Sequence, residues 1–220
     1  MRIDVLTLFP ESIKGFLDES IIKRAINSGK VEINLINFRD YSPLNNNQVD
    51  DTPYGGGAGM VLRCEPIFNA IEDIKTDDSY VIMLTPEGST YKQAKAVELT
   101  NKKHIILLCG HYEGFDERIK TLVDEEISIG DFILTGGELA ASIIIDSVVR
   151  LIDGVITKES LDSESFSDNL LDYPTYTKPA EYKGLKVPDV LISGNHELIK
   201  KWREEERIKK TKEKRPDLLK

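Results

Sequence analysis

Short apolar runs alternate with amphipathic stretches over the larger part of the chain, up to Gly154. The runs carry branched and aliphatic side chains and end in turn residues, which predicts strands over 3–8, 31–38, 80–84, 104–108 and 126–129. Between them, apolar residues recur at helical spacing, which predicts helices over about 10–27, 65–74, 91–100, 116–122 and 139–151. Because strands and helices alternate, we predict an α/β fold with a mainly parallel sheet.

The pattern changes after Gly154. Residues 158–169 are rich in Ser, Asp and Glu and show little periodicity. A last helix is predicted to begin near Asn195, a residue type that caps helix N-termini, and to extend to about Lys212. We therefore predict three parts, namely a main domain over 1–157, a mobile linker over 158–171 and a small, mostly helical domain over 172–220.

Glycine-rich turns follow several of the predicted strands. Four of the five residues 55–59 are glycine, and Gly-containing loops follow the strands that end near Leu84, Leu108 and Ile129. Glycine loses much backbone entropy and packs nothing, so such loops are typical of sharp turns or of close contact with a ligand. Ligands of α/β sheets bind outside the carboxyl ends of the strands. We therefore predict a pocket there, built largely from backbone groups, with apolar walls from Leu84, Ile129, Phe132, Ile133 and Leu134.

The pocket is predicted to suit an adenosine-type cofactor. No Gly-Lys-Ser/Thr follows the glycines, which excludes a P-loop. The glycines lead into Met60 and Val61 rather than a helix start, which argues against a dinucleotide-binding fingerprint. There is no Gly-x-Ser-x-Gly motif, and neither Cys64 nor Cys109 has a histidine at a spacing typical of catalysis.

Composition and charge further limit the classes of protein to which the chain can belong. The two cysteines and three histidines are not spaced as a disulfide framework or a metal site, no apolar stretch is long enough for a membrane span, and 1–10 lacks a signal-peptide pattern. We expect a cytoplasmic protein with no structural metal and no membrane partner. The net charge of −9 argues against nucleic-acid binding, yet ten Lys/Arg and six Asp/Glu give residues 196–220 a net charge of +4. This segment either contacts phosphates or forms a solvated charged helix.

Five motifs resemble those of the bacterial tRNA (guanine-N1)-methyltransferases. They read Leu-Phe-Pro-Glu at 8–11, Val-Asp-Asp-Thr-Pro-Tyr-Gly-Gly-Gly-Ala-Gly-Met at 49–60, Cys-Gly-His-Tyr-Glu-Gly at 109–114, Ser-Ile-Gly-Asp-Phe-Ile-Leu-Thr-Gly-Gly-Glu at 128–138 and Leu-Ile-Ser-Gly-Asn-His at 191–196. The resemblance runs in order from the first residues to Leu219. It implies an S-adenosyl-L-methionine-dependent enzyme of the SPOUT superfamily, with a deep C-terminal trefoil knot in the sheet domain followed by the small helical domain.

The resemblance also implies a homodimer with each active site at the subunit interface. Its substrate is expected to be tRNA, methylated at N1 of the guanosine immediately 3′ of the anticodon when another guanosine precedes it. The knot loops are expected to hold the cofactor. The residues that match are Pro86, Gly88, Gly110, Tyr112, Glu113, Gly114, Ile129, Gly130, Asp131, Phe132, Ile133, Leu134, Gly136 and Gly137. Glu113 either lies near the cationic methionine end or meets a helix dipole.

The implied reaction needs a base for the N1 proton and a cation facing O6, where negative charge builds. Arg150 matches the family's catalytic arginine, although a C-terminal helix cation is the structural alternative. Glu164 occupies the position of the family's general-base aspartate, and Asp162 is the rival. Glu and Asp have similar unperturbed pKa values. The extra methylene displaces the carboxylate by roughly 1.5 Å, whereas sites hold their groups within about 0.5 Å.

The resemblance places Asp50, Gly59 and Ser165 near the target bases. Asp50 is either a guanine reader or a turn-capping residue. The basic C-terminal helix is expected to hold the anticodon arm through phosphate contacts. Mg²⁺ is expected to assist without a dedicated set of protein ligands. Two other interpretations remain open at this point, a catalytically weakened tRNA- or cofactor-binding protein and a knotted methyltransferase that acts on another RNA.

Overall fold

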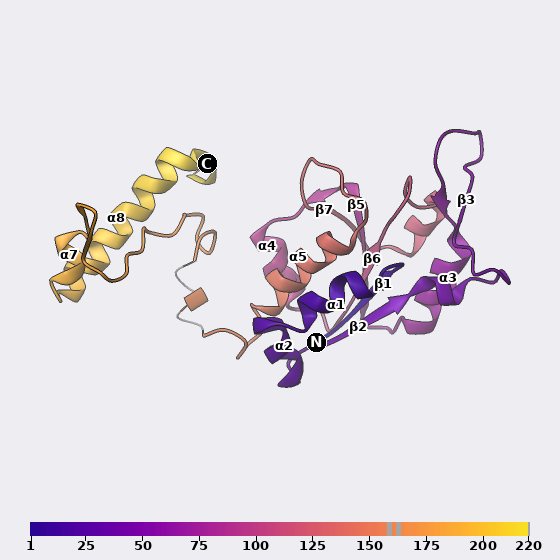
Figure 1. Ribbon diagram of the computed structural model, residues 1–220, viewed down its shortest axis with the longest axis horizontal. Coiled ribbons are helices and arrows are strands. Elements are labelled where there is room, and N and C mark those ends of the chain that lie inside the picture. The colour runs from indigo at the N-terminus through magenta and orange to yellow at the C-terminus, as the bar shows by residue number, and fades with distance from the viewer. Residues whose placement is uncertain (158–159, 162–163, 220) are drawn as a thin grey trace. The chain divides into compact units, whose positions relative to one another are not determined.

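A computed structural model describes residues 1–157, 160–161 and 164–219. The chain forms two compact units, Met1–Ile156 and Thr157–Lys220 (Figure 1). The first unit contains the sheet and the helices that cover it, and the second contains one long helix with several short elements.

The first unit is built on a five-stranded sheet in the order β2-β1-β6-β5-β7, and every neighbouring pair is parallel. This confirms the predicted α/β fold with a mainly parallel sheet. The order places β6 between β1 and β5, so the chain leaves the sheet after β5 and returns to fill an inner position. The strands are β1 (Arg2–Thr7), β2 (Glu32–Asn37), β5 (Ser79–Thr90), β6 (His104–Cys109) and β7 (Glu125–Ser128).

Both faces of the sheet are buried, because successive side chains of a strand point to opposite faces. In β6, Ile105 and Leu107 join the core on one face, whereas Ile106 and Leu108 join the core on the other. The first face is covered by α1 (Glu11–Leu17), α2 (Ser20–Asn27), α4 (Gln93–Leu99) and α5 (Glu138–Val149) (Figure 1). The second is covered by α3 (Cys64–Ile74) and by two 3₁₀ helices, η1 (Phe38–Tyr41) and η2 (Glu117–Leu122).

Three element predictions need correction. The helix predicted over about 10–27 is two helices, because Asp18 ends α1 and Ser20 adopts a left-handed φ of 53° that the helix interior does not allow. The helix predicted over 116–122 is the tighter 3₁₀ helix η2. The strand predicted over 80–84 extends to Thr90, with Leu84 and Ser89 both opposite Ile127, so residues 85–88 form a bulge in one long strand.

The glycine-rich run forms the tip of a hairpin. Its short antiparallel strands are β3 (Asp50–Asp51) and β4 (Val61–Leu62), with Asp50 opposite Leu62. Leu62 also forms a parallel bridge to Phe115, in the loop that follows β6. The hairpin is therefore joined by backbone bonds to a loop at the carboxyl edge of the sheet.

The second unit contains one long helix, as its sequence predicted. Helix α8 (His196–Lys214) begins after Asn195, whose side chain accepts a hydrogen bond from the N–H of Leu198 at 3.2 Å, so the predicted N-cap is confirmed. The remaining elements are the hairpin β8 (Glu181–Tyr182) with β9 (Leu185–Lys186), the short helix α7 (Asp189–Ile192) and the 3₁₀ helix η3 (Pro216–Leu219). Among the described residues of this unit only Thr211 is fully buried.

Candidate active site

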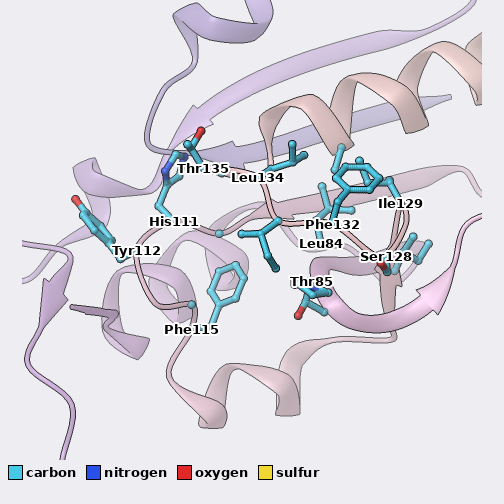
Figure 2. Close-up of a pocket in the computed structure, with 18 of the residues that line it drawn as sticks. Leu84, Thr85, His111, Tyr112, Phe115, Ser128, Ile129, Phe132, Leu134 and Thr135 are labelled. Atoms are coloured by element: carbon cyan, nitrogen blue, oxygen red, sulfur yellow. The ribbon is translucent and has the colours of Figure 1, made fainter. Parts of the chain in front are cut away.

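A cavity of about 300 Å³ lies beside the bulge of β5 and the carboxyl ends of β6 and β7 (Figure 2). Three segments form it: the bulge of β5, the loop that follows β6, and the loop between β7 and α5. The strands are parallel, so their carboxyl ends meet at one edge of the sheet, which is where ligands of such sheets bind. The cavity therefore lies where the sequence predicted a pocket.

Most of the residues that the resemblance assigned to the cofactor line this cavity. They are Pro86, Gly110, Tyr112, Glu113, Gly114, Ile129, Gly130, Phe132, Ile133, Leu134, Gly136 and Gly137. Gly88 and Asp131 are not among the lining residues. Gly88 instead packs against the next strand, since a Cβ there would lie 2.4 Å from the backbone N of Ile127. Asp131 is exposed at the turn before Phe132.

Sequence reasoning did not assign several residues that also line the cavity. They are Thr85, His111, Phe115, Ile127, Ser128, Thr135 and Ala140. Phe115 packs over Gly110, where a Cβ would lie 2.7 Å from the ring. The positions 111 and 115 lie inside or next to the glycine-containing loop after β6, so their place in the loop was the available signal.

The cavity has an apolar part and a polar part. Figure 2 shows the side chains of Leu84, Phe115 and Phe132 in the wall, whereas Tyr112 points away from the other labelled side chains. His111 and Thr135 line another side of the cavity (Figure 2). The arrangement suits a ligand with a flat apolar ring at one end and polar groups at the other.

A buried carboxylate holds the polar part in place. Glu138, the first residue of α5, is 8% exposed, and its Oε1 accepts a hydrogen bond of 2.5 Å from the Thr7 hydroxyl at the end of β1. The Nε2 of His111 lies 2.8 and 2.9 Å from the two oxygens of Glu138. The Thr7 hydroxyl in turn accepts from the N–H of Phe9 at 2.9 Å. We call Thr7, His111 and Glu138 the carboxylate clamp, because they join β1, the loop after β6 and α5.

Cys109 lies beside this clamp at the end of β6. Burial raises the pKa of its thiol well above the usual range, and the charge of Glu138 raises it further. Cys109 is therefore a neutral, packed thiol rather than a nucleophile.

The hairpin lies against the loop that follows β6. The N–H of Glu113 donates to the carbonyl of Met60 at 2.9 Å, and a Cβ at Gly59 would lie 2.4 Å from the side chain of Glu113. Glu113 is not at a helix N-terminus, since Asp116 caps η2 by accepting from the N–H of Arg118. The helix-dipole alternative for Glu113 is therefore wrong.

Asp50 and Asp51 differ in their surroundings. Asp51 accepts from the N–H of Thr52 at 2.8 Å and pairs with Arg63 at 2.8 Å, so Asp51 is the residue that caps the turn. Asp50 is half-buried, and among the described residues its carboxylate has no hydrogen-bond or ion-pair partner. The turn-capping alternative therefore applies to Asp51 and not to Asp50.

The residues assigned to proton transfer lie in different parts of the chain. Arg150 is the C-cap of α5 in the first unit and is half-buried. Glu164 belongs to the second unit, as does Ser165, whose hydroxyl accepts from the N–H of Asp172 at 2.9 Å. Asp162 lies outside the described residues. Each is therefore described within its own unit.

Within residues 1–157, 160–161 and 164–219, no three His, Cys, Asp or Glu side chains lie together as a metal site. No helix in this part of the chain has both the length and the apolar character to cross a membrane.

A parallel sheet with a cavity at its carboxyl edge defines an α/β protein of the class that binds ligands at that edge. Over residues 1–220 the chain matches the family described as tRNA (Guanine-1)-methyltransferase TrmD. The protein belongs to this family, which confirms the resemblance and the enzyme class that it implied.

Individual relatives agree along the whole chain. The "tRNA (guanine-N(1)-)-methyltransferase" of Mycoplasma capricolum subsp. capricolum is 54% identical over 220 residues, which cover 100% of this chain and 92% of that protein. The protein of the same name from Staphylococcus aureus strain N315 is 56% identical over 222 residues, covering 100% of this chain and 91% of that protein. The similarity therefore includes both units.

Proposed function

We propose that the protein transfers a methyl group from S-adenosyl-L-methionine to N1 of the guanosine immediately 3′ of a tRNA anticodon, when another guanosine precedes it. The observation that carries the proposal is the three-loop cavity at the carboxyl edge of the sheet in a chain of this family. The guanine base, its position in the tRNA and the choice of methyl donor are parts of the proposal.

The residues present fit the cofactor. The cavity volume of about 300 Å³ is at the lower end of the range for small-molecule sites. Leu84, Ile129 and Leu134 offer apolar walls for an adenine ring, and the glycine-containing loops let backbone N–H and C=O groups approach it. Glu113 offers a carboxylate for the cationic methionine end. When bound, S-adenosyl-L-methionine supplies the electrophilic methyl group.

We place a trefoil knot at this cavity. Two close backbone approaches support it. A Cβ at Gly88 would lie 2.4 Å from the N of Ile127, and a Cβ at Gly137 would lie 2.7 Å from the Cα of Cys109. The N–H of Gly137 also donates to the carbonyl of Gly110 at 3.0 Å. The chain that leads into α5 thus passes directly against the end of β6, as a threaded chain does.

The chemical roles follow from what guanine requires. Its N1 carries a proton and becomes a nucleophile when that proton leaves, which a positioned carboxylate accepts. We assign this role to Glu164, with Asp162 as the rival. Charge then builds on O6, and the guanidinium of Arg150 faces it with donors that are always protonated. Positioning the N1 atom in line with the methyl group is the work of the surrounding loops.

Asp50 suits the reading of the guanine that precedes the target, because the N1 of that base keeps its proton. A carboxylate accepts hydrogen bonds from both N1–H and the exocyclic amine, which no other base offers in that pattern. The half-buried carboxylate of Asp50 has no partner among the described residues, whereas its neighbour Asp51 is occupied by the turn. Gly59 and Ser165 complete our assignment of the substrate side. We assign Mg²⁺ an assisting role on the RNA, without protein ligands.

A homodimer is part of the proposal. Helix α5 and the loop before it carry a group of exposed apolar side chains, which we call the α5 patch: Phe132 at 54% exposure, Ile133 at 80%, Leu139 at 63% and Ile143 at 47%. Exposed apolar side chains that lie together mark interaction surfaces. A second copy of the chain would cover the patch and bring the cavity of each subunit to the interface.

The test uses the purified protein, methyl-labelled S-adenosyl-L-methionine and an unmodified tRNA transcript with two adjacent guanosines at the 3′ edge of the anticodon. The control transcript has the first guanosine replaced. We expect label at N1 of the second guanosine and none in the control. Label on another nucleotide would instead support a methyltransferase acting at a different RNA site.

The replacement of the family's aspartate by Glu164 makes one further outcome informative. If no label is transferred while calorimetry shows that the cofactor binds, the protein is a catalytically weakened binder. The variant Glu164→Asp should then restore transfer, because it removes the extra methylene. A parallel reaction in EDTA tests the role of Mg²⁺, and an unchanged rate would remove the metal from the proposal.

A further inference from the structure

The second unit has a groove of its own, separate from the cavity of the sheet. It is open, has a volume of about 560 Å³, and lies between the segment that begins at Tyr173 and the helices α7 and α8. Its floor is aliphatic, with Leu191 and Ile199 among its residues, and Tyr173 and Tyr176 supply aromatic rings. The resemblance assigns phosphate contacts to the helix α8 but no base-binding role to this groove.

The charges at the groove have one sign. Lys178 and Arg203 line it, and no acidic residue does. The guanidinium of Arg203 stacks over the ring of Tyr173 at 4.7 Å, and neither cation has a carboxylate partner among the described residues. Several other cations of α8 are paired with carboxylates, as Lys209 is with Glu206 at 3.7 Å. The groove therefore has two cations without a carboxylate partner among the described residues, Lys178 in the segment before β8 and Arg203 on α8.

The aromatic side chains are placed for contact with a flat ligand. Tyr176 is 50% exposed, and its ring centroid lies 6.5 Å from that of Trp202 at a tilted angle. Bases of single-stranded RNA stack on such exposed rings, while cations beside the rings meet the backbone phosphates. An apolar peptide would leave the two cations without a partner, and a free phosphate would leave the aromatic rings without one.

We propose that this groove holds one unstacked nucleotide of the RNA substrate, with the base against Tyr176 and the phosphate between Lys178 and Arg203. The proposal rests on the proposed function in one respect, that the substrate is tRNA. It adds a second base-binding position that is distinct from the site of the methylated guanine. This position would strengthen RNA binding without touching the reacting atoms.

Trp202 is the only tryptophan of the chain, so its fluorescence reports on this groove. We would titrate the full-length protein with a short single-stranded oligoribonucleotide and with an abasic oligomer of equal length, at one fixed salt concentration. We expect the first to quench Trp202 and the abasic oligomer to bind about tenfold more weakly or worse, since base–aromatic stacking contributes at that level. Equal binding of both would reduce the groove to a phosphate patch and overturn the proposal.

Matched variants separate the groove from the rest of the unit. Tyr176→Ala and Lys178→Gln should each weaken binding of a labelled tRNA about fivefold or more in fluorescence anisotropy. Tyr182→Ala and Lys209→Gln make the same chemical changes outside the groove, at a tyrosine of 61% exposure and a paired lysine. Equal losses in both sets would overturn the proposal. Circular dichroism checks that each variant keeps its helices.

Methyl transfer distinguishes this proposal from the proposed function. In the groove variants we expect the KM for tRNA to rise and kcat at saturating tRNA to stay unchanged, because uniform binding has been removed. Quenching of Trp202 by RNA without any methyl transfer would support the groove proposal and contradict the proposed function. Normal methyl transfer with no quenching of Trp202 and no effect of Tyr176→Ala would contradict the proposed role of the groove in RNA binding.

Discussion

Among single residues, Glu138 best explains how the segments that form the cavity are held together. A carboxylate that is 8% exposed needs hydrogen-bond partners, and the carboxylate clamp supplies them from β1 and from the loop after β6. Thr7 lies 131 residues away in the sequence, so no local pattern predicted the pair. The clamp fixes the start of α5 and the loop that carries Tyr112 and Glu113 relative to the sheet.

The clamp predicts different effects for two substitutions of Thr7. Thr7→Val keeps the shape and removes the hydroxyl, which leaves the Glu138 carboxylate and the Phe9 N–H short of a partner. We expect a loss of about 1–3 kcal/mol in the free energy of unfolding. Thr7→Ser keeps the hydroxyl and should lose less. Urea denaturation with a comparison of midpoints measures both, and equal midpoints for Val and Ser would show that the hydroxyl contributes nothing.

The two thiols should react slowly in the folded protein. Burial raises the pKa of Cys109 well above its usual range, with Glu138 the second cause, and burial also raises the pKa of Cys64. The thiolate is the reactive form, so a raised pKa leaves less of it at pH 8. We expect Cys109 to stay unlabelled by a disulfide reagent at pH 8 until the protein is unfolded. Rapid labelling of Cys109 in the native protein would contradict this.

The raised pKa of Cys109 also predicts the direction in which stability changes at alkaline pH. A thiol with a raised pKa in the folded state holds its proton more tightly there than in the unfolded chain. Its contribution to stability is present below the unfolded pKa of about 8.5 and is lost as the pH rises above it. Cys109→Ala should therefore lose stability less steeply above that pH than the wild type does, in denaturation curves at several pH values.

At the scale of elements, hydrophobic periodicity predicted most of the sheet domain. The strands, α3, α4 and α5 follow the apolar patterns closely, because each element buries a regular face or stripe. The pattern missed the break at Ser20, since the apolar positions of α1 and α2 continue one helical stripe across it. It also missed the extension of β5 beyond Leu84, because what holds that segment is the pairing of Ser89 with Ile127 in another strand.

The site was predicted in the same uneven way. Glycine-containing loops identified the edge of the sheet and most of the cavity lining, because glycine is required where backbone approaches backbone or ligand. The side chains that support the loops, Thr7 and Glu138, gave no signal, because their importance depends on contacts between distant segments. The order in which the loops pass one another likewise depends on tertiary structure and not on any local preference.

Gly137 and Gly15 offer a matched test of the close approach at the cavity. Gly137 has an ordinary φ of −80°, so alanine there is opposed only by space, with its Cβ 2.7 Å from the Cα of Cys109. Gly15, inside α1, has nothing within 4 Å of such a Cβ. We expect Gly137→Ala to lose about 1–3 kcal/mol of stability. Gly15→Ala should instead gain about 0.5–1 kcal/mol, because alanine suits a helix better.

Cofactor binding separates a local effect from a general one in this pair. Calorimetry should show weaker binding of S-adenosyl-L-methionine to Gly137→Ala and unchanged binding to Gly15→Ala. If Gly137→Ala keeps wild-type stability and affinity, the chain does not pass closely against Cys109, and the proposed knot loses this support.

At the scale of the whole molecule, the two units differ in how they bury their side chains. The first has a closed core on both faces of the sheet. In the second, Leu185, Ile192 and Leu198 are each more than half exposed. A unit with so little enclosed core gains from surfaces supplied by others, whether a second subunit or RNA. The first unit would likewise gain from a second subunit that covers the exposed α5 patch.

A mixing experiment tests whether two subunits complete one active site. In the proposed homodimer, a site completed by Arg150 of one subunit and Glu164 of the other would leave the Arg150→Ala and Glu164→Ala homodimers each inactive. Unfolding and refolding an equal mixture forms heterodimers in which one of the two sites receives both native residues. For random pairing this restores roughly a quarter of the wild-type activity.

A double variant and the patch itself supply the controls for that experiment. A chain with both substitutions, mixed with wild type, gives heterodimers in which each site lacks one residue, so only wild-type homodimers contribute. Ile143→Glu, in the α5 patch, should prevent pairing and abolish the recovery, whereas Val97→Glu, at a similar exposure of 51% on α4, should not. If the mixture of single variants stays inactive while light scattering shows dimers, each site draws both residues from one chain, because only that arrangement leaves every heterodimer without an intact pair.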